Sequence, residues 1–276
     1  MEIIPLLLLV LVCMALLLGY PVAFTLAGVS LLFAFLGSIT GFFDPAIFKS
    51  IPIRIFGIMN NVALLAVPLF VFMGTLLERS GVAGQMLSNM AKAFQNIRGG
   101  TSISIIIVGA LLAASTGIVG ATVVTMGLMS LPILIKQGYE KDFSAGLVAS
   151  TGTLGQIIPP SIALVLLGDV MSNAYQRAQN NLGIFSQKTV TVGDLFIGAI
   201  IPGIIICTSY LLYTIYKNYQ NKNIVISVSA EKIGSIELIK TLALPVFLIL
   251  IVLGSIIIGI ATPTEAAGIG AFGAIL

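Results

Sequence analysis

The sequence has no histidine, no tryptophan, two cysteines, and charged residues at only 8% of its 276 positions. Without histidine, and without a Gly-x-Ser-x-Gly or His-Glu-x-x-His pattern, it lacks the residues of the commonest hydrolase and zinc sites. Cys13 and Cys207 lie in separate apolar runs and are expected to be packing residues. The four aspartates are scattered near predicted loops, so intramembrane proteolysis lacks its acid pair. The sequence therefore predicts no enzyme, no catalytic residue and no cofactor.

Basic runs are also missing, which argues against a nucleic-acid partner. What the sequence has is apolar: 58% of its residues are hydrophobic, and its mean hydropathy is +1.14. Soluble domains carry about 25% charged residues. Several runs reach the roughly 20 residues that cross a bilayer core, whereas an outer-membrane barrel would show short alternating strands. The sequence predicts an all-α, polytopic membrane protein.

Hydropathy and helical periodicity predict the membrane helices. They are expected at residues 3–18, 21–38, 59–78, 143–171, 194–217, 239–259 and 262–276. The first run lacks a basic leader and an Ala-x-Ala site, so it is expected to stay as a helix rather than to be removed. Val82–Phe94 and, more weakly, Ala230–Ile239 have the apolar spacing of amphipathic helices at a membrane surface. Ordinary surface linkers are the alternative for both.

The stretch from Gly99 to Lys136 has two apolar arms that meet at a small, hydroxyl-rich sequence. The arms, Thr101–Ala114 and Ala121–Ile135, are each short for a full crossing, which favours a re-entrant hairpin. One long kinked helix is the alternative. With the hairpin, nine lysines and arginines collect on one side of the membrane and four on the other. The basic side is expected to be cytoplasmic, and it holds the hairpin mouth.

Two breaks interrupt the apolar chain between Leu111 and Ile162. The first is the hairpin tip, and the second is Ser150–Ser161, which contains Pro159 and Pro160. Backbone groups freed at membrane depth survive only when they are buried in protein or line a wet cavity, and paired broken helices commonly form transporter ion sites. We therefore expect the two breaks to be neighbours that together form a binding site.

A sodium ion is the expected occupant, because carbonyls and hydroxyls can surround it without burying a full negative charge. The tip offers the hydroxyls of Ser115 and Thr116 and a flexible backbone at Gly117. The second break offers carbonyls left without helical donors upstream of the prolines, with flexibility at Gly152 and Gly155. No metal other than sodium is predicted.

An anionic substrate group is expected at the free amides where the helices restart after each break. Thr122, Thr125 and Ser161 are the predicted hydroxyl donors, and a carboxylate is the natural guest. In the alternative, serine and threonine only satisfy local carbonyls, and glycine only permits close helix packing.

A weak internal repeat relates Gly19–Val29 to Gly259–Ile269. Both copies follow an apolar helix and open another, and the predicted topology gives them opposite orientations, as in inverted-repeat transporters. The sequence would then stop just inside the second repeat, so we expect a fragment. Glu265 within the second copy is expected to cap a helix. Glu78 and Asp169 are expected to face water or a neighbouring arginine.

At these residues the chain resembles the large membrane subunit of tripartite ATP-independent periplasmic (TRAP) transporters, the DctM-like family. The resemblance covers nearly the whole chain. The sequences that carry it are Gly19-Tyr-Pro21, Pro68-Leu-Phe-Val-Phe-Met-Gly74, Gly120-Ala-Thr122, Gly152-Thr-Leu-Gly-Gln-Ile-Ile-Pro-Pro-Ser161 and Gly259-Ile-Ala-Thr-Pro-Thr-Glu-Ala-Ala267.

The resemblance implies a sodium-driven importer of organic acids, supplied by a periplasmic binding protein and working with a small four-helix membrane subunit. It implies an elevator-like movement of a hairpin-bearing core against a scaffold. It further implies that Gly155, Ile158 and Pro160 give backbone oxygens to sodium opposite the tip. The chain departs from many relatives at Ile118, where they have a hydroxyl residue.

The predicted organisation has four parts. Residues 1–98 form scaffold helices and an amphipathic arm, and 99–171 form the transport core with the hairpin and the broken helix. Residues 172–240 form an outer loop, a scaffold helix and a cytoplasmic arm, and 241–276 begin the second, incomplete repeat. A stand-alone anion/sodium symporter and a non-transporting scaffold subunit remain alternatives for the function.

Overall fold

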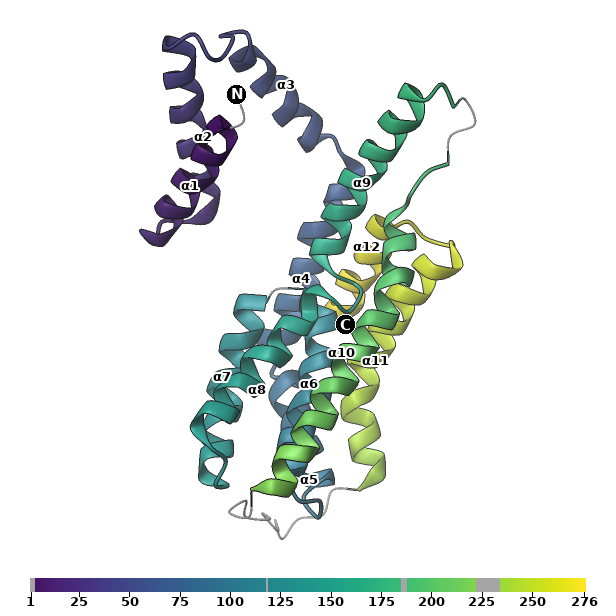
Figure 1. Ribbon diagram of the computed structural model, residues 1–276. Coiled ribbons are helices and arrows are strands. Elements are labelled where there is room, and N and C mark those ends of the chain that lie inside the picture. Colours follow the sequence, from purple (N-terminus) through teal and green to yellow (C-terminus); the bar gives the residue numbers. More distant parts are fainter. Residues whose placement is uncertain (1–2, 118, 185–187, 222–233) are drawn as a thin grey trace. The chain divides into compact units, whose positions relative to one another are not determined.

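The computed structural model describes residues 3–117, 119–184, 188–221 and 234–276 (Figure 1). Within these ranges all regular structure is helical, with twelve α-helices and two short 3-10 helices. The predicted all-α class is confirmed. By its internal contacts the chain divides into two compact units, Met1–Asn61 and Val62–Leu276. The four functional parts proposed from the sequence stay predictions.

The first unit contains α1 (Ile3–Leu17), α2 (Val22–Ile39) and α3 (Ile47–Met59). The first two match their predicted ranges and pack on each other. The third was not predicted, because Lys49, Pro52 and Arg54 interrupt its apolar pattern. One proline removes one helical donor, and the remaining turns of α3 form in spite of it.

The second unit holds the rest of the described chain. Its elements are η1 (Val62–Leu65), α4 (Ala66–Arg79), α5 (Val82–Ala93), α6 (Gly100–Thr116), α7 (Val119–Lys136), α8 (Lys141–Thr153), η2 (Leu154–Gln156), α9 (Ile162–Asn181), α10 (Val192–Gln220), α11 (Ser235–Ile258) and α12 (Pro263–Ile275).

Five helical segments of the described chain are long and apolar enough to cross a membrane. They are Val22–Ile39, Val62–Arg79, Val119–Lys136, Val192–Gln220 and Ile236–Ile258. Their outward-facing side chains are large and apolar, as expected for helices that are surrounded by lipid. The polytopic membrane class is confirmed. One expectation needs correction: α7 has 18 residues and is by itself long enough for a crossing, longer than the arm predicted from the sequence.

The helix α5 is the amphipathic helix expected at Val82–Phe94, and that prediction is confirmed. Its apolar face is buried, with Met86 and Leu87 in the core that α5 forms with α6, α7 and α8. Thus α5 packs against protein. The second amphipathic stretch differs from its prediction. Its residues up to 233 lie outside the described ranges, and Ile236 and Ile239 belong to the first turns of α11 rather than to a separate helix.

A second core joins α4, α9, α10, α11 and α12. Small residues allow α12 to approach α4 closely: a Cβ built on Gly270 would lie 2.6 Å from the sulfur of Met73. The hydroxyl of Thr264 also donates to the carbonyl of Val62, at 2.8 Å. The segment that begins the predicted second repeat is therefore packed firmly within this unit.

The two copies of the internal repeat share their local backbone geometry. Gly19 and Gly259 both have φ of 80°, the left-handed conformation that ends a helix, and a new helix begins three or four residues later. At the second copy Thr262 and Glu265 form a reciprocal capping box, with the Glu265 carboxylate 2.8 Å from the Thr262 amide. The predicted capping role of Glu265 is confirmed. The inverted orientation of the copies stays a prediction.

The helix α10 is the longest element, with 29 residues and a length of about 43 Å. Near its end, Asn218 donates to the Ser102 hydroxyl at 2.9 Å, which attaches it to the start of α6. Near its middle, a Cβ built on Gly203 would lie 3.3 Å from Ile158, in the predicted second break. The helix α10 therefore runs alongside the hairpin and continues past it (Figure 1).

The helix α9 extends ten residues beyond the predicted end at residue 171. Its last turns are polar, so hydropathy alone ended the prediction too early. The side chain of Gln179, which is buried, bonds the backbone of Lys188 in both directions at 2.8 and 2.9 Å. These bonds fix the end of α9 to the chain that leads into α10.

Candidate ion site at the hairpin tip and the helix break

The helices α6 and α7 form a hairpin. Gly109 and Met126, each about nine residues from the tip, face one another, since a Cβ on Gly109 would lie 3.6 Å from the Met126 methyl group. Gly117 ends α6 with φ of 61°, which only glycine adopts readily, and its amide donates to the Ala113 carbonyl at 3.1 Å. One continuous kinked helix, the alternative from the sequence, is wrong.

The predicted broken helix is also present. The helix α8 gives way to the 3-10 turn η2, and α9 starts at Ile162. Pro159 and Pro160, joined by a cis peptide bond, have no amide hydrogens to continue the helical ladder. Ser161 caps α9: its hydroxyl accepts from the Leu164 amide at 3.4 Å and donates to the Gln156 carbonyl at 2.8 Å.

The two breaks are neighbours, as predicted. A Cβ built on Gly155 would lie 2.8 Å from the Ala113 carbonyl oxygen in α6, and one on Gly117 would lie 3.2 Å from the Ile162 side chain. The side-chain amide nitrogen (Nε2) of Gln156 donates to the backbone carbonyl oxygen of Gly117 at 2.7 Å. Backbone contact and a side-chain bond thus join the tip to the break.

Gln156 was not among the predicted site residues. Its position between Gly155 and the prolines was a weak signal, because it is the only amide side chain in that motif. A sequence pattern alone could not show that this amide points toward the tip.

The depth of the site follows from α10. Gly203, which faces Ile158, is the twelfth of the 29 residues of α10. At 1.5 Å per residue, about 16 Å of α10 precedes this point and about 26 Å follows it. The tip and the break therefore lie well inside the span of the longest apolar helix.

The residues of the tip that were predicted to bind sodium differ in their hydrogen bonds. Ser115 is buried, and its hydroxyl donates to the Leu112 carbonyl at 2.8 Å, which leaves its oxygen lone pairs unused by that bond. The side chain of Thr116 and all of Ile118 lie outside the described residues. The Gly117 carbonyl accepts from Gln156. A carbonyl oxygen has two lone pairs, so this bond does not exhaust it.

The predicted residues of the break have two structural roles. Gly152 and Gly155 allow close packing: a Cβ on Gly152 would lie 3.2 Å from the Val123 backbone of α7. No hydrogen bond between described residues ends on the carbonyl oxygen of Gly155, Ile158 or Pro160. These three carbonyls belong to the segment that Gln156 joins to the tip.

The predicted substrate donors are not equivalent either. Thr122 is buried in the second turn of α7. The hydroxyl of Thr125 donates to the carboxylate of Glu78 in α4, and Ser161 is fully buried as the cap of α9. Glu78 therefore has a threonine partner on the hairpin, where water or a neighbouring arginine was expected. The assignment of all three residues to a substrate stays a prediction.

The described residues contain no group of three or more histidine, cysteine, aspartate or glutamate side chains that could hold a metal ion. Neutral oxygens are thus what the tip and break present. Hard monovalent cations accept such ligands, and carboxylate-rich sites of the kind that bind calcium need charged groups that are not gathered there.

Comparison with known proteins decides the family. The family model described as "Tripartite ATP-independent periplasmic transporter, DctM component" matches residues 7–276. The chain belongs to the DctM family. This result confirms the resemblance drawn from the motifs, all of which lie within the matched residues.

Three curated relatives are similar to this DctM-family chain over most of its length. It is 31% identical over 266 residues to the C4-dicarboxylate TRAP transporter large permease protein DctM of Vibrio cholerae, which covers 96% of this chain and 53% of the relative. It is 30% identical over 222 residues to the DctM of Rhodobacter capsulatus, covering 80% and 50%. It is 27% identical over 251 residues to the sialic acid TRAP transporter large permease protein SiaM of V. cholerae, covering 91% and 53%.

The chain spans about half the length of the curated relatives it matches. The relatives are named as transporter permeases, which agrees with the prediction that this DctM-family chain is not an enzyme. Together with the apolar helices, family membership confirms an integral membrane protein and agrees with the bacterial inner membrane as its location.

Proposed function

We propose that this chain is part of the large membrane subunit of a sodium-coupled secondary transporter that imports organic acids. The observation that carries the proposal is the contact between two helix breaks within the apolar span, where the carbonyls of Ile158 and Pro160 accept no hydrogen bond from described residues. Backbone carbonyls in such a position are suited to a cation that has lost its water.

The proposed sodium site combines the tip, Ser115–Gly117, with the break, where Gly155, Ile158 and Pro160 contribute carbonyl oxygens. Gly152 and Gly155 would let the break approach α6 and α7 closely, and Gln156 would hold the Gly117 carbonyl in place. No residue with a formal charge is required. The same neutral oxygens could not hold a divalent ion as strongly, because they offer no countercharge.

The substrate is proposed to be a carboxylate. Two relatives are named as C4-dicarboxylate transporters and a third as a sialic acid transporter, which supports an organic acid as the class. The amides at the start of α9 and α7 carry partial positive charge, and Ser161 and Thr122 lie beside them. Thr125 could join them by releasing its bond to Glu78.

The proposed working assembly is tripartite: this subunit, a small four-helix membrane subunit and a periplasmic substrate-binding protein. The description of the matching family as a tripartite periplasmic transporter component supports it. The hairpin and broken helix would move together in an elevator-like step, since a side-chain bond and close backbone contacts join them.

Two measurements test the proposal. In vesicles containing the complete protein with its partners, replacing sodium by potassium should abolish organic-acid uptake, and unchanged uptake would refute the coupling. In detergent, sodium should raise the unfolding temperature of the chain itself, and potassium should not. A ligand at 100 times its Kd stabilises a protein by about 2.7 kcal/mol, which such a measurement detects readily.

A further inference from the structure

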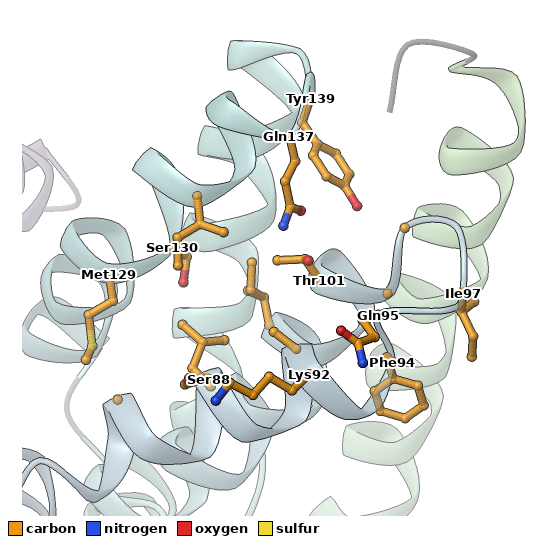
Figure 2. A pocket seen from close by; sticks show the side chains of 17 residues that line it. Ser88, Lys92, Phe94, Gln95, Ile97, Thr101, Met129, Ser130, Gln137 and Tyr139 are labelled. Atoms are coloured by element: carbon orange, nitrogen blue, oxygen red, sulfur yellow. The ribbon is translucent and has the colours of Figure 1, made fainter. Parts of the chain in front are cut away.

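A pocket of about 440 Å³ lies between α5, the start of α6 and the second half of α7 (Figure 2). Its volume is in the range of small-molecule sites, which are mostly apolar with a few convergent polar groups. Ile105 and Met129 line it, each twelve residues from Gly117, or about 18 Å along the hairpin arms. The pocket is therefore separate from the proposed sodium site.

Ser130 is the first sign that this pocket takes a ligand. Its side chain is fully buried, and its hydroxyl has no hydrogen-bond partner among the described residues. Ser104 and Ser115, by contrast, donate to carbonyls three or four residues earlier in α6. Figure 2 shows the Ser130 oxygen directed into the pocket. A buried hydroxyl without a partner is costly, so a polar group is expected to meet it.

The start of α6 is the second sign. Gly99, Gly100 and Thr101 line the pocket, and no side chain caps this 17-residue helix. The Thr101 amide donates to no acceptor among the described residues. Free amides at the start of a helix carry partial positive charge and favour an anion.

The remaining charge at the pocket is positive. Lys92 lines the pocket from α5, its amine next to Ser88 in Figure 2, and the lining contains no aspartate or glutamate. Tyr139 adds no negative charge, because burial raises the pKa of its hydroxyl above the usual value. Apolar side chains form the rest of the lining, namely Leu87, Ile105, Met129 and Ile133. A ligand with an anionic head and a hydrocarbon body would match the positively charged part and the apolar part of this lining.

We propose that this pocket binds an anionic amphiphile. Its phosphate or carboxylate head lies at the start of α6 beside Lys92 and Ser130, and its apolar chain follows α7. Two sources share this chemistry, a phospholipid of the surrounding leaflet and a free fatty acid. Because α5 joins the scaffold helix α4 to the hairpin, occupancy would brace the mouth of the hairpin. The site does not depend on sodium coupling or on the transported substrate.

Native mass spectrometry of the purified chain tests the proposal with three probes: dioleoylphosphatidylglycerol, dioleoylphosphatidylcholine and laurate. At least one anionic probe should bind tenfold or more tightly than phosphatidylcholine. Lys92→Gln should remove most of this preference. Lys136→Gln is the matched control, because Lys136 is exposed at the end of α7 and does not line the pocket. It should leave binding unchanged.

Ser130→Leu fills the pocket from the opposite wall and should also weaken binding. If that variant fails to fold, Lys92→Gln still decides. Phosphatidylglycerol binding alone supports the site and identifies a lipid, and laurate binding alone supports it and identifies a free fatty acid. Equal binding of phosphatidylglycerol and phosphatidylcholine without laurate binding, or an anionic preference that survives Lys92→Gln, overturns the proposal.

Discussion

The side-chain amide of Gln156 donates a 2.7 Å hydrogen bond to the backbone carbonyl of Gly117, across 39 residues of sequence. It joins the turn after α8 to the tip of the α6–α7 hairpin. Regular α-helix is interrupted in both segments at this point, and the bond ties one interruption to the other.

Gln156→Leu removes the donor to the Gly117 carbonyl. We expect a loss of about 1–2 kcal/mol in unfolding free energy, together with the loss of sodium-dependent stabilisation, because the tip carbonyl is no longer held. Unfolding temperatures in sodium and in potassium measure both effects. Gln85→Leu, at an exposed position of α5, is the control and should change stability by less than about 0.5 kcal/mol. A variant that keeps its full response to sodium would exclude Gln156 from the site.

Gly155→Ala places a methyl group 2.8 Å from the Ala113 carbonyl oxygen. Since that atom belongs to the α6 backbone, the helix must shift, and we expect a destabilisation of about 1–3 kcal/mol. Gly146→Ala is the matched control in α8, where an added Cβ meets nothing within 4 Å. It should be neutral or slightly stabilising. Thermal unfolding of the two variants compares them, and equal behaviour would contradict the close packing of the break on α6.

Thr125→Val removes the hydroxyl that donates to the carboxylate of Glu78. Hydrogen bonds to charged groups contribute about 1.5–3 kcal/mol, so we expect a loss in this range. A double-mutant cycle with Glu78→Leu, which removes the acceptor, isolates the pair, and the two substitutions should couple by about 0.5–3 kcal/mol. Additive effects of the two changes would show that the contact between α4 and the hairpin contributes nothing to stability.

Gly99→Ala tests the contact between α10 and the start of α6. Gly99 has φ of 79°, and an added Cβ would collide with the Asn218 side chain. The left-handed backbone alone costs a non-glycine residue roughly 1–2 kcal/mol. We expect faster amide hydrogen exchange near residues 215–220, at the end of α10, with little change near Val192. Uniform exchange along α10 would mean that the contact does not hold its end.

The elements that the sequence predicted well are those with local signals. Gly117 and the Pro159-Pro160 pair interrupt helices through their own backbone chemistry, so the hairpin and the break could be predicted from residue types. The Val82–Phe94 helix was evident from its periodicity. Glu265 follows Thr262 by three residues, the spacing of a capping box. Each of these features depends on a few consecutive residues.

The features that were missed depend on tertiary contacts or on exceptions to simple patterns. The bond of Thr125 to Glu78 joins residues 47 apart on different helices, and no local pattern predicts it. The helix α3 was missed because Lys49, Pro52 and Arg54 interrupt its apolar pattern. The end of α9 was missed because hydropathy does not detect polar helical turns. The buried, unpartnered hydroxyl of Ser130 becomes visible only when its surroundings are known.

The glycine at position 203 leaves room for the break beside α10. A leucine there would extend into the space that the Ile158 side chain occupies, since a Cβ alone would already lie 3.3 Å from that side chain. If the break moves along α10 in the proposed elevator-like step, such a side chain would raise the barrier to that movement. It would also destabilise the arrangement seen in the structure.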